Sequence, residues 1–436
     1  MFSRDRFVRL QAAPTDPPVR RDMTANLDRL NDIFSFLQER QPVFVDDLAA
    51  LVNVDCGTDN KAGVDWVGDW LQTRLHAMNA AVTRFPQEQY GDCWLGVWRG
   101  GGRRRVLLVA HLDTVYPPGT AAARPMRIEG DRAIGPGVSD MKGGLLAGLY
   151  AMAALQNVRF DDFDEIALWA VSDEEVDSPV SHEITAKLAP RFDAVYVLEA
   201  ARANGDIVSA RKGSGQYTFT VTVEADRPGV DPGKGANAIL ELARRIVTLQ
   251  NLNGSIPGVS VNPGLIEGEA ALDAPSGRAS VIVDVRVGAP EQIPLLDQAM
   301  RRLAADPPPR PGVRISVEGG VTMPPMPYRP ATAALIERAQ SIARRLRFHI
   351  DHAFTGGSSD GNFAAAAGAL VLDGLGPIGG LDHSPAEYLD LESIAPRTAL
   401  LAGLIMETPL YEIRTERTQD LRRLNGLERE EVFEFL

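Results

Sequence analysis

The sequence predicts an α/β fold, in which a mostly parallel sheet with flanking helices is interrupted by a smaller α+β domain. Three short apolar runs predict buried central strands: RVLLVA at 105–110, IALWAV at 166–171 and AVYVL at 194–198. A small, apolar helical segment at 143–155 separates the first two runs, and strands that alternate with helices favour parallel pairing. The length of 436 residues also exceeds what one hydrophobic core usually serves, which favours two domains.

Helical periodicity opens the folded part of the chain. Apolar residues recur at steps of three and four over 23–52 and again over 64–75, so each segment has one apolar face. Strands are predicted next, at 81–85 and 94–98. Residues 1–26 mix charged and apolar residues without a continuous apolar core, so we expect an extension rather than a secretory signal.

The pattern changes near residue 214, where a second domain is predicted. The segment QYTFTVTVE alternates with period two, as a half-exposed strand does, and opens the order βαββαβ of a ferredoxin-like sandwich. The six elements are expected at 216–224, 236–248, 259–266, 279–287, 290–304 and 313–317. A Pro-rich connector at 322–330 follows, because proline opposes helix formation.

Beyond this connector the pattern of the first domain resumes. Helices are predicted at 331–346 and 394–406 and strands at 348–352 and 369–372, and the charge-dense tail 412–436 predicts a terminal helix or an arm. The simplest organisation has three parts: an extension at 1–26, a discontinuous α/β domain at 27–213 and 326–436, and an inserted domain at 214–325.

Composition excludes several classes of protein. Lys+Arg 45 against Asp+Glu 58 gives a net charge of -13, which argues against nucleic acid, whose phosphates attract a basic surface. Cys56 and Cys93 are too few for a disulfide framework or a thiolate metal site, so a reducing compartment is expected, by default the cytoplasm. No apolar run approaches the roughly 20 residues of a membrane span.

Polar residues follow the first buried strand and open the first buried helix. In the extended segment after RVLLVA, residues 111 and 113 share a side, so Asp113 can orient the imidazole of His111. A structurally satisfied pair is an equal alternative. Asp140, in GPGVSDMKGG, precedes the helix at 143–155, where an N-cap without further function would also explain it.

Acidic residues also follow the second and third buried strands. The polar segment Ser172-Asp173-Glu174-Glu175 comes directly after IALWAV. Its three carboxylates are costly there unless a positive group faces them, although a solvated loop would also suit them. Glu199 ends AVYVL, and His383 lies in a Gly-rich loop before the last helix. Open α/β sheets place their sites at such strand ends. Jointly, two histidines and several carboxylates suit a divalent ion such as zinc, manganese or cobalt.

These motifs resemble one known family, the co-catalytic di-zinc peptidases and amidohydrolases. It includes glutamate carboxypeptidase, aminoacylase, acetylornithine deacetylase and succinyl-diaminopimelate desuccinylase, and the sequence is most similar to the glutamate carboxypeptidase branch. The resemblance covers about 27–406, and the motifs occur in family order: VAHLDTV, GPGVSDMKGG, SDEE, FTGGSSDGNF and LDGLGPIGGLDHSPAEYL. It implies the family's zinc-peptidase-like fold with an inserted lid or dimerisation domain.

The resemblance also implies roles for individual residues. It implies two Zn²⁺ ions, with Mn²⁺ or Co²⁺ as alternatives, bound by His111, Asp140, Glu175, Glu199 and His383. Asp140 would bridge the two ions, with a cis peptide after it, and each ion would take one histidine. Glu174 would be the general base, and Asp113 would orient the histidine beside it.

The chain departs from the family pattern at the substrate end. A lid histidine of the family falls on Arg227 here, and a family asparagine, thirteen residues before the matching Arg286, falls on Asp273. Arg227 and Asp273 could form an ion pair that rebuilds this end of the site, Asp273 could face a cationic or uncharged substrate group, or either residue could face solvent. Gly357 is expected to shape a loop that lines the site, or only a turn.

The sequence therefore predicts a metal-dependent hydrolase that cleaves a peptide or amide bond of a small substrate and, like a carboxypeptidase, releases an amino acid. The alternatives are an N-acyl-amino-acid deacylase, a dipeptidase, or a repurposed non-hydrolytic binding protein, the last prompted by Arg227 and Asp273. The expected partners are a small peptide or N-acyl amino acid and a second copy of the chain, bound through the inserted domain. Neither nucleic acid nor a membrane is expected.

Overall fold

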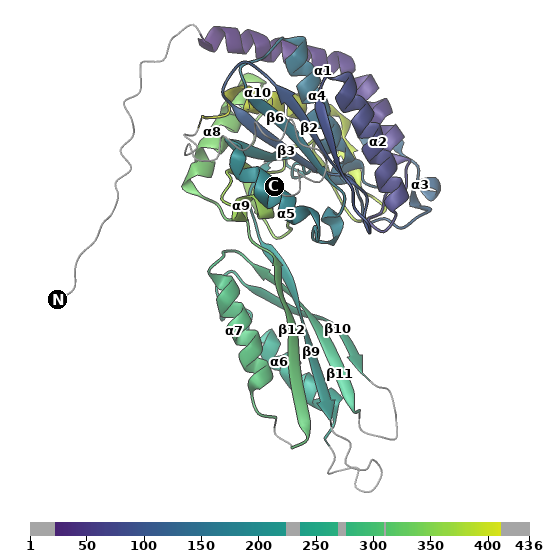
Figure 1. Cartoon of the computed structure of the whole chain (residues 1–436), viewed down its shortest axis with the longest axis vertical. Coiled ribbons are helices and arrows are strands. Elements are labelled where there is room, and N and C mark those ends of the chain that lie inside the picture. Colours follow the sequence, from purple (N-terminus) through teal and green to yellow (C-terminus); the bar gives the residue numbers. More distant parts are fainter. Residues whose placement is uncertain (1–21, 224–235, 269–275, 309–310, 411–436) are drawn as a thin grey trace, which may run out of the picture.

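The structure is a computed structural model that describes residues 22–223, 236–268, 276–308 and 311–410. The predictions for the first 21 residues and for the tail 412–436 lie outside these residues. The described chain forms an α/β body from which an elongated inserted domain projects (Figure 1). Within the described residues, no helix is both long and apolar enough to cross a membrane.

A six-stranded sheet forms the centre of the α/β body. Its spatial order is β1 (Ala81–Phe85), β2 (Cys93–Arg99), β6 (Glu165–Val171), β3 (Arg105–His111), β7 (Ala194–Val197) and β14 (Val371–Leu372). The last four strands are parallel to one another, and β1 and β2 pair antiparallel. Every residue of β6 and β7 is buried, as their continuous apolar sequences predict. The predicted mostly parallel sheet is therefore confirmed.

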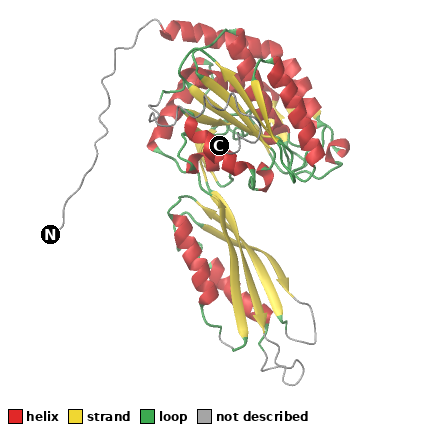
Figure 2. Ribbon diagram, viewed as in Figure 1, coloured by secondary structure: helices red, strands yellow, loops and turns green. Residues whose placement is uncertain are grey.

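Helices cover both faces of this sheet (Figure 2). One face packs against α1 (Asp22–Val52), α2 (Lys61–Ala77), α4 (Gly143–Asn157), α8 (Pro330–Arg345) and α10 (Ile394–Glu407). The other face packs against α5 (Ser181–Leu188) and α9 (Gly361–Ala366). Helices α4 and α10 are apolar almost all round because both lie inside the largest core cluster.

Short strands join distant segments around the carboxyl edge of the main sheet. One small sheet has the order β15 (Gly379–Gly380), β16 (Tyr388–Asp390), β5 (Arg132–Ile134) and β4 (Arg127–Glu129). A second pairs β8 (Ile207–Arg211) with β13 (His352–Thr355) in parallel. Two- and three-residue strands are too short to show periodicity, so sequence alone did not predict them.

The strand predicted at 348–352 is misplaced. The chain there still caps α8: the amide of Phe348 donates to the carbonyl of Ala343 at 3.0 Å, and Arg347 turns into the left-handed region with φ 66°. The strand β13 starts only at His352. The apolar pattern therefore predicted a strand over residues that in the structure follow the end of helix α8.

The inserted domain has the predicted ferredoxin-like order. Its elements are β9 (Gly213–Val223), α6 (Ala238–Gln250), β10 (Ser260–Gly268), β11 (Arg278–Val287), α7 (Gln292–Ala305) and β12 (Val313–Met323). The sheet order is β10-β11-β9-β12, with all neighbours antiparallel. Alternate residues of β11 are buried in this domain's own core, which explains its period of two.

The chain enters and leaves the inserted domain at one place. Arg211 and Met326 exchange backbone hydrogen bonds of 2.9 and 3.0 Å, so the outgoing and returning segments are paired at the junction. Gly213 follows, where a Cβ atom would lie 2.5 Å from the carbonyl oxygen of Met323. Only glycine permits this approach of the two segments. The domain limits at 213/214 and 325/326 stay a prediction.

Candidate metal centre

Four candidate ligands follow the carboxyl ends of parallel strands or lie in loops beside them. His111 is the last residue of β3, Glu175 follows β6, and Glu199 follows β7. Asp140 lies in the turn that leads into α4. Because these strand ends meet at one edge of the sheet, residues far apart in the sequence converge there.

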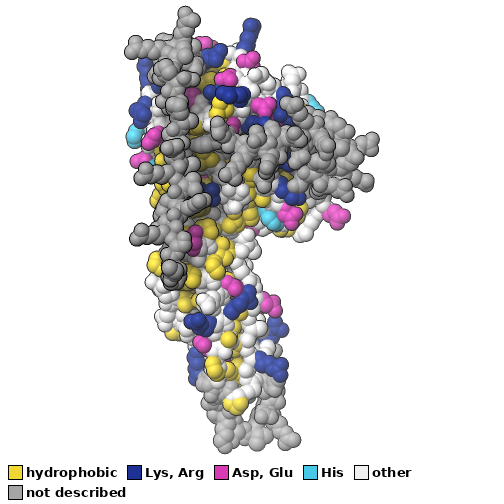
Figure 3. All heavy atoms as spheres, turned by 60° about the vertical axis from the view of Figure 1, so that its left-hand side comes forward, with side chains coloured by type: hydrophobic (Ala, Val, Ile, Leu, Met, Phe, Trp, Pro, Cys, Tyr) yellow, Lys and Arg dark blue, Asp and Glu magenta, His cyan; other side chains and the backbone are white. Residues whose placement is uncertain are grey.

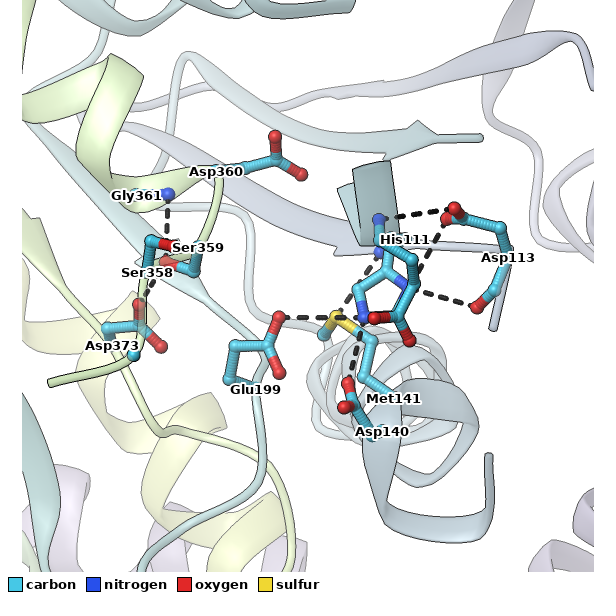
Figure 4. A network of polar contacts seen from close by, with 12 residues as sticks. His111, Asp113, Asp140, Met141, Glu199, Ser358, Ser359, Asp360, Gly361 and Asp373 are labelled. Atoms are coloured by element: carbon cyan, nitrogen blue, oxygen red, sulfur yellow. Dashed lines mark hydrogen bonds and ion pairs between the residues drawn. The ribbon is translucent and has the colours of Figure 1, made fainter. Parts of the chain in front are cut away.

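Two groups of three potential ligands share the carboxylate of Asp140. In the first group the Nε2 atom of His111 lies 3.0 Å from Oδ1 of Asp140 and 3.6 Å from Oε1 of Glu199 (Figure 4). In the second group the Nε2 atom of His383 lies 3.0 Å from Oδ2 of Asp140 and 3.2 Å from Oε2 of Glu175. Within each group the ligand atoms lie within 4.8 Å of one another. Asp140 therefore offers one oxygen to each group.

The backbone around Asp140 rules out a simple helix cap. Helix α4 starts at Gly143, and Asp140 has non-helical angles, φ -116° and ψ 90°, inside the preceding turn. The peptide between Asp140 and Met141 is cis, as predicted. The N-cap interpretation of Asp140 is therefore wrong, because its carboxylate faces His111 and His383 instead of the helix amides.

Asp113 lies behind His111. Its backbone oxygen is 3.0 Å from Nδ1 of His111, and its Oδ1 atom is 3.4 Å from the same nitrogen. Thr58 donates its hydroxyl to Oδ2 of Asp113 at 2.7 Å, and the amide of Glu175 donates to the same oxygen at 3.3 Å. With a proton on Nδ1, these oxygens hold the imidazole so that the lone pair on Nε2 points towards Asp140.

The histidines and the shared carboxylate perturb one another. Burial alone would lower the pKa of His111, but hydrogen bonds to Asp113 and Asp140 raise it well above 6.5. Hydrogen bonds to Asp140 and Glu175 raise the pKa of the exposed His383 to about 10. Burial would raise the pKa of Asp140, yet its hydrogen bonds to the two histidines hold it below its usual range. These shifts have one cause, because the carboxylates around the two histidines favour positive charge between them.

The pKa values of the three glutamates at the site are shifted upwards by burial. Desolvation raises the pKa of Glu174 and of Glu199 well above the usual value of 4.5, and neighbouring carboxylates add to the effect. Desolvation also raises the pKa of Glu175, whose buried Oε1 atom has no hydrogen-bond partner among the described residues. Half-buried carboxylates with an unpartnered oxygen are the donor set that a divalent cation would satisfy. The residues present therefore fit a metal pair.

A loop on the far side of the site is held by buried polar contacts. Ser359 donates to Oδ2 of Asp373 at 2.6 Å (Figure 4). Arg211 binds both carboxylate oxygens of Asp373 at 2.6 and 3.0 Å. Ser178 donates to Asp360 at 2.6 Å, and burial raises the pKa of this carboxyl to about 7. The sequence motif FTGGSSDGNF predicted this loop but not its anchoring arginine.

The predicted substrate residues are only partly placed. Arg227 and Asp273 lie outside the described residues. Arg286 lies on β11 and binds the carboxylate of Asp284 with two contacts of 3.2 Å. Gly357 is exposed, and its carbonyl accepts a hydrogen bond from Arg211 at 3.3 Å, so it belongs to the loop anchored by that arginine.

One buried carboxylate near the site was missed from sequence. Glu387 lies four residues after His383 and is 1% exposed, and it accepts hydrogen bonds from backbone amides on both sides of Ser139. A glutamate between Pro385-Ala386 and Tyr388 carries no local signal of burial. Its place in the same loop as His383 was the only hint in the sequence.

A shared carboxylate between two His–carboxylate groups, at the carboxyl edge of an α/β sheet, defines the class of dinuclear metallohydrolases. The family comparison narrows this class: the model of Peptidase family M20/M25/M40 matches residues 107–407, and the chain belongs to this family. The predicted family is thereby confirmed, and the protein is a metal-dependent hydrolase of peptide or amide bonds.

Two curated relatives match most of the chain. Carboxypeptidase G2 from Pseudomonas sp. (strain RS-16) is 28% identical over 394 residues, which cover 87% of this chain and 92% of the relative. Succinyl-diaminopimelate desuccinylase from Sphingopyxis alaskensis is 27% identical over 369 residues, covering 78% and 92%.

Solved structures show the same fold at low identity. A tripeptidase from Staphylococcus aureus has a TM-score of 0.71 at 18% identity and covers 84% of this chain and 98% of its own. A dinuclear metal-binding peptidase of the M20 family from Bacillus subtilis has a TM-score of 0.64 at 15% identity, covering 85% and 100%.

Proposed function

We propose that this protein releases an amino acid from a small peptide or an N-acyl amino acid, as a carboxypeptidase does, with two divalent metal ions bound in the two ligand groups. The observation that carries the proposal is the position of Asp140, whose two carboxylate oxygens each lie 3.0 Å from a different histidine. A carboxylate placed in this way can bridge two ions. The resemblance to carboxypeptidase G2 over 87% of the chain supports the carboxypeptidase-like reaction.

The proposed ligands are His111, Asp140 and Glu199 for one ion and Asp140, Glu175 and His383 for the other. Imidazole and carboxylate donors suit Zn²⁺, and they also accept Mn²⁺ or Co²⁺. When bound, such a pair polarises the substrate carbonyl and makes water a better nucleophile. The buried His111 and the exposed His383 place the second group nearer to solvent.

Glu174 is the proposed general base. It is half-buried between β6 and the ligand Glu175, and desolvation raises its pKa well above 4.5. A carboxyl whose pKa is raised by desolvation suits a group that takes a proton from water and returns it to the leaving amine. Asp113 keeps the imidazole of His111 oriented during this exchange.

The substrate end of the site is proposed to involve Arg286, with Arg227, Asp273 and Gly357 beside it. Arg286 is half-buried and already bound to Asp284, so a substrate carboxylate would have to share the guanidinium with that residue. An N-acyl-amino-acid deacylase and a dipeptidase remain as alternatives within the family. A non-hydrolytic binding protein is the alternative outside it.

The inserted domain is proposed to form a homodimer contact. Its strand β10 lies at an edge of the sheet and exposes Leu265 and Ile266, at 53% and 58%. Helix α6 exposes Val247 at 64%, and Figure 3 shows hydrophobic side chains at the surface of this domain. An open edge strand with apolar side chains favours pairing with a second chain.

Two buried free cysteines, Cys56 and Cys93, support a cytoplasmic location.

A hydrolysis screen tests the proposed function. Metal-free protein is reloaded with Zn²⁺, Mn²⁺ or Co²⁺ and offered N-acyl amino acids and dipeptides, including basic ones. The wild type should release amino acid, Glu174→Ala should lose most turnover, and Glu183→Gln, an exposed glutamate on α5, should keep it. Binding of these compounds without turnover in any metal form would favour the binding protein instead.

A further inference from the structure

A single buried carboxylate joins three segments that carry proposed ligands. Glu387 is 1% exposed, and both of its oxygens accept hydrogen bonds. Oε1 accepts from the amides of Ser139 and Asp140 at 2.9 and 3.1 Å and from the hydroxyl of Ser139 at 3.3 Å. Oε2 accepts from the amide of Gly137 at 2.9 Å and from the hydroxyl of Tyr116 at 2.7 Å.

These donors all lie beside proposed metal ligands. The amide of Asp140 belongs to the shared ligand itself, and its turn has non-helical backbone angles that leave its amides outside regular helix bonding. Tyr116 follows His111 by five residues and also donates to the carbonyl of Ser384 at 3.0 Å, in the loop of His383. Both histidine segments and the Asp140 turn therefore meet at one carboxylate.

We propose that Glu387 is a positioning residue that sets the affinity for both metal ions by fixing the backbone of Asp140 relative to His111 and His383. This inference rests on the proposed dinuclear site. Glu387 does not reach the site itself: its contacts are with amides and hydroxyls behind it. Buried hydrogen bonds of this kind hold ligands in place, and their loss typically weakens metal binding about 10- to 100-fold.

Glutamine at this position cannot replace glutamate. Three of the five groups around the carboxylate are backbone amides, which can only donate: the amides of Ser139 and Asp140 face Oε1, and the amide of Gly137 faces Oε2. A glutamine side chain has one accepting oxygen and one donating NH₂ group. In either orientation the NH₂ group faces donors, so one side of the junction is released. Because Asp140 serves both ligand groups, its displacement should weaken both metal equivalents together.

The test measures the affinity of the folded, metal-free protein for Zn²⁺ by competition with a chromophoric chelator. The wild type should bind two equivalents, and Glu387→Gln should bind both about 10- to 100-fold more weakly. The matched control is Glu241→Gln, which removes a buried glutamate bound to Arg245 in the inserted domain. This control should keep the wild-type affinity for both equivalents.

The outcomes separate the positioning role from the proposed function. A wild type that binds fewer than two equivalents overturns the dinuclear site and the inference with it. A wild type that binds two, with unchanged affinities in Glu387→Gln, overturns the positioning role alone. If Glu387→Gln does not fold, Tyr116→Phe provides the test, because it removes one hydrogen-bond donor to Glu387. An unchanged Zn²⁺ affinity in Tyr116→Phe overturns the positioning role, and a weaker affinity for both equivalents supports it.

Discussion

The α/β body buries charged side chains beside the candidate metal centre, whereas the inserted domain buries them sparingly. Among the described residues, the buried charged side chains of the inserted domain are Glu241 and Arg245, which pair with each other at 3.0 Å. In the α/β body, Asp113, Asp360 and Glu387 are buried and serve the site or the loops around it. Burying a charge is costly, and part of this cost falls beside the candidate metal centre, while Glu165 and Asp193 are buried at the amino ends of strands.

The two regions also differ in what their strands expose. In the inserted domain, the inner strands β9 and β11 alternate buried with more exposed residues, and the outer strands β10 and β12 are largely exposed or half-buried. The central strands of the α/β body are buried on both faces, and their polar residues lie at the strand ends or beyond them. Apart from the proposed substrate residues Arg227, Asp273 and Arg286, the inserted domain should therefore tolerate changes in its charged residues. Changes in the buried charged residues around the candidate metal centre should instead reduce activity or metal binding.

The largest expected effect concerns Glu174. Glu174→Gln keeps the shape of the side chain but removes the proposed base, so kcat should fall about 10²- to 10⁴-fold. Steady-state kinetics on a substrate from the screen measures this loss. The same exchange at Glu241, in the inserted domain, should leave kcat within about two-fold, since a pair remote from the site does not enter the rate. Equal losses in both variants would break the comparison.

A core truncation in the inserted domain should act on stability alone. Leu296, on α7, is fully buried in that domain's core, so Leu296→Ala should cost about 2–5 kcal/mol of its free energy of unfolding. Hydrogen exchange would locate the loss in the inserted domain. Zn²⁺ affinity should stay at the wild-type value, and a large loss of affinity would show that the two regions are coupled.

Metal removal should instead destabilise the α/β body and leave the inserted domain unchanged. Chelation should destabilise the α/β body, because bound ions stabilise by about 2.7 kcal/mol when the free ion is at 100 times its Kd. Hydrogen exchange should rise in the segments around His111, Asp140 and His383 and stay unchanged in β9–β12. Increased exchange across the inserted domain would contradict this expectation.

The smallest expected effect is a pH dependence of the metal-free protein. The pKa of His111 is raised above 6.5, so its stabilising contribution is present below that pH and is lost as pH rises through the folded-state value. The pKa values of Glu174 and Glu199 are raised above 4.5, so their protonated forms stabilise the fold. This stabilisation is also lost as pH rises. The lowered pKa of Asp140 has the opposite effect, because its stabilising contribution is lost as pH falls, but this loss occurs only below about pH 3.8.

The unfolding free energy of the metal-free protein should therefore fall as pH rises above 4.5. With Zn²⁺ bound, the ligands are already deprotonated and this decline should disappear. Urea titrations at several pH values, with and without metal, measure both slopes. Parallel slopes would show that the ligand groups do not control the dependence.

Sequence predicted much of this structure because its signals were local. Strand β1 has the predicted bounds, 81–85, and the apolar runs that predicted β3, β6 and β7 are continuous and short. The five proposed ligands could be predicted because each occurs in a family motif or at a strand end. These features depend on neighbouring residues, which periodicity and motifs can detect.

The rest depended on contacts between distant residues. Glu387 meets the amide of Ser139 across 248 positions, and no local pattern distinguishes it from a surface glutamate. Asp140 looked like a helix cap because the turn that removes it from the helix is set by such contacts. The strand expected at 348–352 was misplaced for a different, local reason: these residues follow the cap of α8, in which the amide of Phe348 donates to the carbonyl of Ala343.

The position of His383 has a consequence for the order of synthesis. Its contact with Asp140 spans 243 positions, and the whole inserted domain is translated between the two residues. A nascent chain therefore carries His111, Asp140, Glu175 and Glu199 long before the second group is complete. Helices α8 and α10, which pack in the same core as α4, also follow the inserted domain in the sequence. Both ligand groups would therefore reach their final positions only after the chain has returned from the inserted domain.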